Sequence, residues 1–260
     1  MHIGWRKQGN VQYTRPYITG NVLWGALAAR MTRDGFFGDY GAAGTFVDEQ
    51  LGVSYLYLSD CPDRVTAYPW TPGAADKFAW KYMGSYSSTA LADGYVKEDG
   101  SLHEIEFLAP ASRPDGEPVY AVGCVFAALP DNGAWRKSLA RLDLGGERSY
   151  GWGRCQLVAV QPCDRPGAVL PGIAEVRLDG ARPLVSVDGG ATLAHVDACL
   201  ESECEGELEP LVGRVTNPSN GYFGVQHSDA VISWRPGARI PGRRWFSVGR
   251  RGVWSFVKEP

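Results

Sequence analysis

A glycine-rich segment at residues 145–154 carries the residue types best suited to hold a phosphate backbone. Glycines let the chain turn tightly and approach a partner closely, and guanidinium groups match phosphate oxygens. Tyr150 and Trp152 add ring faces on which bases can stack. The segment therefore favours RNA contact, with a purely connecting hairpin as the alternative, and the expected contact residues are Gly145, Gly146, Arg148, Ser149, Tyr150, Gly151, Trp152, Gly153 and Arg154.

The same segment lacks the marks of the common nucleotide-cofactor loops. A dinucleotide-binding loop reads G-x-G-x-x-G and opens a helix, whereas residues 155–160 are typical of a strand. A P-loop requires Gly-Lys followed by Ser or Thr, which the segment does not contain. We therefore expect no cofactor.

Two further basic stretches are candidates for RNA contact. Near the N-terminus, Arg6, Lys7 and Arg15 lie among glycines and an aromatic residue, which favours contact with phosphates. In the C-terminal tail, Arg243 and Arg244 suit a clamp on an RNA backbone, and an arginine-rich strand on a solvated face explains them equally well. The net charge of −3 gives no support of its own, so the distribution of charge carries this prediction.

Residues 201–209 hold five glutamates and no basic residue. Carboxylates beside phosphates repel them, so we expect this acidic run to face away from RNA and towards a basic surface on a partner subunit.

Candidates for catalysis are few. The four histidines are candidate general acids or bases by residue type only: His2, His103, His195 and His227. For His2, a solvated or hydrogen-bonding histidine is favoured over a catalytic one. Acids after the first expected helix would allow metal-assisted cleavage of RNA from a Gly-rich loop, and a solvated loop is favoured for Asp34, Asp39, Asp48 and Glu49. We expect no catalytic residue and no metal site.

The six cysteines are scattered without a C-x-x-C pair, which argues against structural zinc. The sequence has no apolar run of about 20 residues, as a membrane span needs, and residues 5–10 lack the apolar core of a signal peptide. We therefore expect a cytoplasmic protein with reduced thiols and no membrane partner.

The expected elements would place the glycine-rich segment between a helix and a strand. Their order is extended segment, helix, strand, strand, helix and strand, over 12–18, 22–31, 53–58, 119–129, 135–142 and 154–160. Asn21 would cap the first helix, and Asp131 or Asn132 the second. This order predicts an α+β, ferredoxin-like (RRM-like) domain with one sheet face free.

Two domains are expected. The first spans residues 1–160, with a long insertion around 59–95 whose many aromatic residues suggest a functional excursion or a small satellite core. After a linker rich in proline and glycine, residues 161–260 are expected to form a smaller β-rich domain.

Two motifs resemble the RAMP superfamily of CRISPR effector proteins. Residues 17–27 are similar to its I-x-G-x-x-L-x-G-A-L signature, and the glycine-rich segment is similar to its G-G-x-x-x-x-G-x-G loop. The two occur in the family's order and span the first 160 residues, and residues 2–10 also resemble the start of type III-like subunits.

The resemblance implies a ferredoxin-like RAMP domain and an RNA-binding role. A β-rich second domain is most similar to the fifth Cas family, whose members cap the crRNA 5′ handle without cleaving RNA. The implied partners are crRNA, target nucleic acid through it, backbone RAMP subunits and a nuclease subunit. The insertion would then be a thumb that wedges into the guide–target duplex or contacts a neighbouring subunit.

Three alternatives stay open. The chain could be a backbone subunit of the seventh Cas family, although those subunits often place the glycine-rich loop nearer the C-terminus. It could be a RAMP endoribonuclease that cleaves target or precursor RNA. It could also be an unrelated β-rich enzyme with a coincidental glycine-rich loop.

Overall fold

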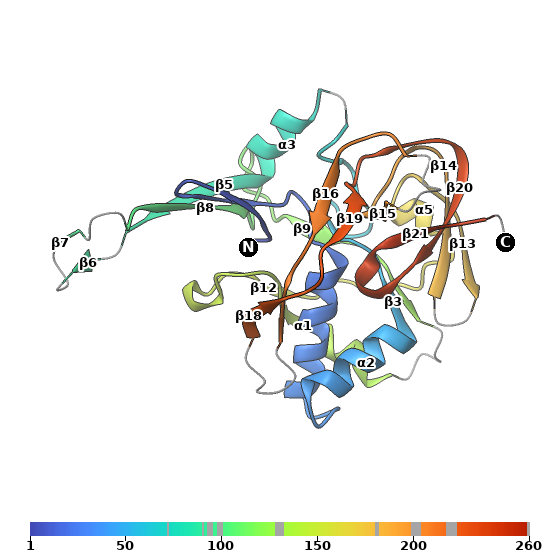
Figure 1. Ribbon diagram of the computed structural model, residues 1–260, viewed down its shortest axis with the longest axis horizontal. Coiled ribbons are helices and arrows are strands. Elements are labelled where there is room, and N and C mark those ends of the chain that lie inside the picture. The colour runs from blue at the N-terminus through green and yellow to red at the C-terminus, as the bar shows by residue number, and fades with distance from the viewer. Residues whose placement is uncertain are drawn as a thin grey trace.

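The computed structural model describes residues 1–71, 73–89, 91–92, 96–97, 101–127, 133–179, 182–198, 204–216 and 223–258. Helices occur together with sheets whose strands pair mostly antiparallel, which confirms the α+β class (Figure 1). The α-helices are α1 (Gly20–Arg33), α2 (Tyr40–Gln50), α3 (Ala75–Tyr82), α4 (Ala134–Ser138) and α5 (Pro166–Val169). No helix of the described residues is long and apolar enough to cross a membrane.

The N-terminal part contains a four-stranded sheet and several short ladders. The sheet has the order β1 (Gly4–Gln8), β2 (Val11–Thr14), β8 (His103–Leu108) and β5 (Met83–Ser88). The ladders pair β3 (Leu51–Val53) with β10 (Val125–Ala127), β4 (Tyr57–Ser59) with β9 (Tyr120–Val122), β6 (Leu91–Ala92) with β7 (Val96–Lys97), and β11 (Arg141–Asp143) with β12 (Arg154–Gln156).

A seven-stranded sheet occupies the C-terminal part. Its order is β13 (Ile173–Asp179), β14 (Arg182–Ala191), β20 (Arg239–Val248), β21 (Trp254–Val257), β15 (Val196–Asp197), β19 (Val231–Trp234) and β16 (Leu208–Leu211). A separate ladder pairs β17 (Arg214–Thr216) with β18 (Phe223–His227). This part is rich in β-structure, as expected.

The first expected helix is confirmed as α1, but its start differs from the prediction. Thr19 is the N-cap and its side chain makes no capping hydrogen bond, so Asn21 does not cap the helix. The start is fixed by packing instead, because a Cβ at Gly20 would lie only 2.3 Å from the carbonyl oxygen of Arg251. Helix α1 buries Leu23 and Leu27 against the rest of the chain.

A second helix occupies much of the stretch expected to be a loop after α1. Helix α2 begins after Asp39, whose carboxylate accepts a hydrogen bond from the Ala42 amide at 2.8 Å. Its apolar side, including Ala43 and Val47, packs on α1 in a shared hydrophobic cluster. Consequently Asp48 and Glu49 lie on a helix and not in a Gly-rich loop.

The other expected elements are shorter than the sequence indicates. The strand expected at 53–58 is divided into β3 and β4, and the one expected at 119–129 into β9 and β10. At the break, the Ser54 hydroxyl accepts a hydrogen bond from the Cys124 amide at 2.8 Å, so a side chain replaces a ladder bond. The helix expected at 135–142 ends at Ser138, and the final strand ends at Gln156.

Residues 128–132, with the caps expected at Asp131 and Asn132, lie outside the described residues. Among the described residues, the predicted strands form separate ladders and not one continuous four-stranded sheet. The structure thus confirms the mixed class and leaves the ferredoxin-like detail a prediction.

The largest hydrophobic cluster contains residues from both sides of position 160. Tyr17 and Tyr57 pack in it with Phe246 and Trp254. Tyr68 and Trp70, from the insertion at 59–95, pack against the same cluster, while Phe78 and Tyr82 belong to a second one. Part of the insertion is therefore core, and the two expected domains share a hydrophobic interior; their boundary stays a prediction.

Candidate nucleic-acid interface

The glycine-rich segment connects the antiparallel strands β11 and β12. It includes a short 3-10 turn at Arg148–Tyr150, flanked by two residues in the left-handed region, Glu147 with φ 59° and Gly151 with φ 79°. We call residues 144–153 the glycine loop. His2 anchors this loop, because its carbonyl accepts a hydrogen bond from the Gly146 amide at 2.8 Å.

The glycines of the loop differ in what surrounds them. A Cβ at Gly145 would lie 2.3 Å from the His2 carbonyl oxygen, and one at Gly153 would lie 2.1 Å from the Leu144 carbonyl oxygen. A Cβ at Gly151 would meet nothing within 4 Å. Gly145 and Gly153 are thus required for the fold of the hairpin, and Gly151 is the one that leaves open space beside its backbone.

Four aromatic side chains meet where the glycine loop contacts the sheet. The Trp152 ring centroid is 5.2 Å from that of Phe107, 6.2 Å from that of Tyr86 and 6.4 Å from that of Tyr150. Tyr86 is 51% exposed and Tyr150 is 55% exposed, so the cluster opens to solvent. We call Tyr86, Phe107, Tyr150 and Trp152 the aromatic cluster.

A glycine and a histidine help to place the Phe107 ring in this cluster. Gly84 pairs directly with Phe107 across β5 and β8, and a Cβ at Gly84 would lie 2.8 Å from the ring. The missing side chain therefore makes room for the ring across the sheet. His2 links β8 to the glycine loop. Its Nδ1 lies 2.8 Å from the carbonyl oxygen of Glu106, next to Phe107, and its own carbonyl accepts a hydrogen bond from the Gly146 amide.

The strand register shows which residues share the face of the aromatic cluster. Paired residues on neighbouring strands point to the same side of a sheet, and successive residues alternate. Lys7 pairs with Gln12, Gln12 with Ile105, and Ile105 with Tyr86, so this row crosses all four strands. Residues on this face of β5 and β8 also include Gly84, Ser88, His103 and Phe107.

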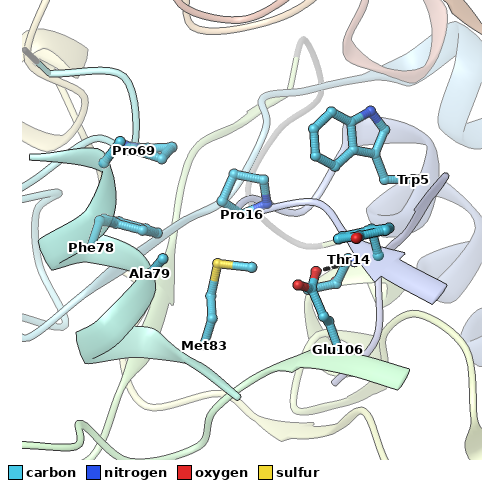
Figure 2. A pocket seen from close by; sticks show the side chains of 10 residues that line it. Trp5, Thr14, Pro16, Pro69, Phe78, Ala79, Met83 and Glu106 are labelled. Carbon is cyan, nitrogen blue, oxygen red and sulfur yellow. Dashed lines mark hydrogen bonds between the residues drawn. The ribbon is translucent and has the colours of Figure 1, made fainter. Parts of the chain in front are cut away.

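The opposite face carries the acids of β8 and faces α3. Glu104 and Glu106 alternate with the residues above, and an open hollow on this side is lined by Trp5, Tyr13, Phe78, Met83 and Glu106 among others (Figure 2). The Glu106 carboxylate accepts a hydrogen bond from the Thr14 amide at 3.1 Å. In Figure 1, α3 and the hairpin that carries the glycine loop lie on opposite sides of β5 and β8.

The cations predicted for RNA contact have different environments. Arg154 is exposed on β12. Arg148 is also exposed, yet its guanidinium donates to the carbonyl oxygens of Gly145 at 3.1 Å and Asp143 at 2.8 Å, so it braces the loop. Lys7 lies on the face of the aromatic cluster, whereas Arg6 stacks over the Trp5 ring at 4.4 Å.

Arg15 is not at the surface, which corrects its place among the expected RNA contacts. It is 6% exposed, and its guanidinium pairs with the Glu209 carboxylate at 2.5 Å. His195, fully buried, lies in the same group, with Nε2 2.5 Å from Glu209 and Nδ1 2.7 Å from the Tyr55 hydroxyl. We call Arg15, Tyr17, Tyr55, His195 and Glu209 the Arg15 junction.

The protonation states in this junction follow from its burial and its partners. Burial by itself raises the pKa of the Glu209 carboxyl, but the hydrogen bond from His195 and the charge of Arg15 outweigh it and hold that pKa at about 2. Burial lowers the pKa of His195. A neutral His195 donates from Nε2 to Glu209 and accepts at Nδ1 from the Tyr55 hydroxyl.

The acidic run meets basic residues of its own chain. Glu209 pairs with Arg15, and Glu207 forms an ion pair with Arg235. Glu201 and Glu203 lie outside the described residues. Glu207 and Glu209 therefore pair with arginines of this chain, where a basic surface on a partner subunit was expected.

Arg243 and Arg244 lie far from the glycine loop. They are on β20, which lies at the right in Figure 1, whereas β5, β8 and β12 lie further to the left. The Arg243 guanidinium pairs with Glu175 at 2.5 Å and lies 5.5 Å from the Trp245 ring centroid. The structure therefore does not join them with the glycine loop in one contact surface.

The candidate catalytic acids have structural partners. Asp34 forms an ion pair with Arg30 at 2.5 Å and accepts a hydrogen bond from Ser138 at 2.8 Å. Asp39 caps α2, and burial raises the pKa of Asp48, although Arg250 opposes this shift. No group of three or more potential metal ligands occurs in the part of the chain that the structure describes.

Sequence reasoning missed Phe107 and the role of Tyr86. The alternation of residues 103–108, HEIEFL, is a strand signal that predicts Phe107 and Ile105 on one face and the glutamates on the other. Tyr86 belongs to the insertion, and only its pairing with β8 places it beside the glycine loop.

Comparisons with known proteins find similarity only at the level of solved structures. No family model matches the sequence, and no curated protein matches it. A chain in "Cryo-EM structure of the Type III-B Cmr-beta bound to cognate target RNA" is 11% identical, with a TM-score of 0.48 over 91% of this chain and 82% of that one. A chain in the related structure with AMPPnP, state 1, is 10% identical, with a TM-score of 0.49 over 92% and 82%.

Proposed function

We propose that this chain is an RNA-binding structural subunit of a type III CRISPR effector complex, and that it caps the 5′ handle of the crRNA. The proposal rests on the two RAMP-like motifs and on how the chain brings them together. It includes the view that the N-terminal ladders are an interrupted form of the ferredoxin-like RAMP domain.

One observation carries the proposal. The first motif lies on α1 and the second is the glycine loop, more than a hundred residues later. Leu23 and Ala26 of α1 pack in one cluster with Leu142 of β11 and Leu144, the first residue of the loop. The helix therefore supports the loop that the resemblance assigns to RNA, and coincidental motifs would have no reason to meet.

The arrangement of charges favours a scaffold over a nuclease. Asp34 and Asp39, the acids most suited to hold a metal after α1, are already engaged by Arg30, Ser138 and the start of α2. His195 is fully buried. We therefore propose that the subunit has no nuclease activity of its own, and a RAMP endoribonuclease is the second candidate.

The test is binding and cleavage of repeat-derived RNA by the purified chain. We expect RNA with a 5′ handle to bind more tightly than the same RNA without it, and to stay intact with Mg²⁺ or EDTA. Arg154→Ala should weaken binding. Arg64→Ala is the control, because it removes an arginine that is 58% exposed and lies outside the glycine loop and β12, and it should leave binding unchanged. Equal affinity for both RNAs would contradict the capping role.

Target cleavage by the reconstituted complex separates scaffold from nuclease. Asp34→Ala and Asp39→Ala each remove one acid while leaving the glycine loop unchanged. If either variant abolishes cleavage in a complex that still assembles with its guide RNA, the chain is a nuclease.

A further inference from the structure

We infer that the face bearing the aromatic cluster binds unpaired bases of single-stranded RNA by stacking. The inference deepens the proposed function, because it joins Tyr86 and Phe107 of the sheet with Tyr150 and Trp152 of the glycine loop in one base-binding site. Three observations support the inference: the geometry of the rings, the separation of charges between the two sheet faces, and the exposure of Tyr86 and Tyr150.

The rings offer stacking surfaces that are fixed in place. Phe107 and Trp152 are half-buried and contact each other at 5.2 Å between centroids in an edge-on arrangement. Trp152 in turn contacts the rings of Tyr86 and Tyr150, whose exposed fractions are 51% and 55%. Exposing two tyrosines beside two further rings is unfavourable in water unless a partner covers them, and flat bases fit such rings.

The charges on this face match a nucleic acid. Register places Lys7, Gln12, His103 and Tyr86 on it, while alternation directs Glu104 and Glu106 to the other face. None of the strand residues assigned to this face, within the described part of the sheet, is acidic. The adjoining hairpin adds two exposed arginines, Arg148 on the glycine loop and Arg154 on β12, beside two acids, Glu147 and Asp143.

The geometry favours single strands over duplexes. A ring can stack only on a base whose face is free, and in a duplex both faces of an internal base are covered by its neighbours. Stacking without hydrogen bonds to base edges also tolerates any base. We therefore expect the site to take unpaired nucleotides with little sequence preference.

The experiment combines binding with a fluorescent base. Single-stranded RNA carrying 2-aminopurine at successive positions is titrated with wild type, Tyr86→Ala, Tyr150→Ala and Tyr86→Phe. Stacking quenches 2-aminopurine, so wild type should quench it strongly at one or a few positions. The alanine variants should lose that quenching and about tenfold in affinity, and Tyr86→Phe should keep both.

Trp80→Ala is the matched control. Trp80 is 54% exposed, lies on α3 at the other face of the sheet, and should be dispensable for quenching and affinity. Thermal melts should be unchanged for Tyr86→Ala, since its side chain is mostly in solvent. Duplex RNA of the same length should bind all variants alike.

Each remaining outcome decides between the two proposals. Wild type that binds no RNA would contradict the proposed function itself. Wild type that binds RNA, with Tyr86→Ala and Tyr150→Ala quenching and binding equally well, would overturn the stacking site alone. If Tyr86→Ala releases a neighbouring protein from the complex while RNA binding persists, the rings hold a protein and the inference is wrong.

Discussion

The aromatic cluster and the Arg15 junction each contain two tyrosines, in opposite environments. At the junction, a guanidinium, two tyrosines, a histidine and a carboxylate satisfy one another, with Arg15 only 6% exposed. At the cluster, Tyr86 and Tyr150 remain open to solvent, and the strand residues described on the same sheet face include no acid. Tyrosines therefore take part either in a buried ion-pair network or in an exposed binding surface, and the position of the nearest carboxylate separates the two.

The largest expected effect comes from removing the carboxylate of the junction. Glu209→Gln leaves the buried Arg15 without its counter-charge, and breaking a buried ion pair in this way costs about 3–5 kcal/mol. We expect the free energy of unfolding in urea to fall by that amount. Glu207→Gln, whose side chain is 75% exposed, should cost less than about 1 kcal/mol.

A loss as small for Glu209→Gln as for Glu207→Gln would show that the junction is not a lock. The junction would then stabilise the fold no more than an exposed ion pair does.

The pH dependence of stability tests the same junction with the wild-type chain. The pKa of Glu209 lies at about 2 in the folded state, against 4.5 for a free glutamate. The unfolded chain therefore binds this proton more readily, so the stabilisation is complete above pH 4.5 and is lost as pH falls towards 2. The loss is about 3 kcal/mol by linkage.

Urea unfolding between pH 6 and pH 2.5 measures this slope. In Glu209→Gln the corresponding part of the slope should be absent, because glutamine does not titrate. A variant that keeps the full slope would assign the acid sensitivity to other carboxylates.

Substitutions in the glycine loop should have smaller effects on stability than Glu209→Gln, and they separate glycines needed for folding from a glycine needed for RNA binding. Gly153→Ala places a Cβ 2.1 Å from the Leu144 carbonyl at φ 84°, and we expect a loss of about 1–3 kcal/mol in stability. Gly151→Ala has open space around it, so only its φ of 79° opposes the change, at about 1 kcal/mol. Thermal melts and RNA affinity, measured on both variants, show which glycine is needed for stability and which for RNA binding.

Gly151→Ala should weaken RNA binding while leaving the melt nearly intact. A collapse of the melt for Gly151→Ala would show that the whole loop is structural.

The smallest effect is expected from single cations at the loop. Arg154→Ala should lower RNA affinity about uniformly across sequences and reduce the slope of log affinity against log salt by roughly one. Arg148→Ala should do the same and also loosen the loop, because its guanidinium holds the Gly145 and Asp143 carbonyls. A loss restricted to particular sequences, with an unchanged slope, would indicate contact with base edges.

The local parts of the fold were predictable from the sequence. Helix α1 followed from the spacing of Leu23 and Leu27, and the place of the glycine loop before a strand followed from the glycines themselves. These features depend on residues close together in the chain.

The parts that depend on distant residues were not predictable. Arg15 is buried because Glu209, 194 positions away, faces it, and no local pattern shows such a pairing. The aromatic cluster requires β5 and β8 to lie beside β1 and β2, and the parallel pairing of β2 with β8 is invisible to strand propensity. Helix α2 was missed because its glycines and polar residues resemble a loop until Asp39 caps it.

The contacts of α1 and the junction have a consequence for synthesis. Three N-terminal residues pack against partners that are synthesised much later. These pairs are Arg15 with Glu209, Gly20 with the Arg251 carbonyl, and Tyr17 with Phe246. At 5–20 residues per second, a ribosome needs roughly 10 to 50 s to complete these partners. During that time the nascent chain exposes the tyrosines of its future interior, so the N-terminal segments can complete their packing only when the last strands emerge.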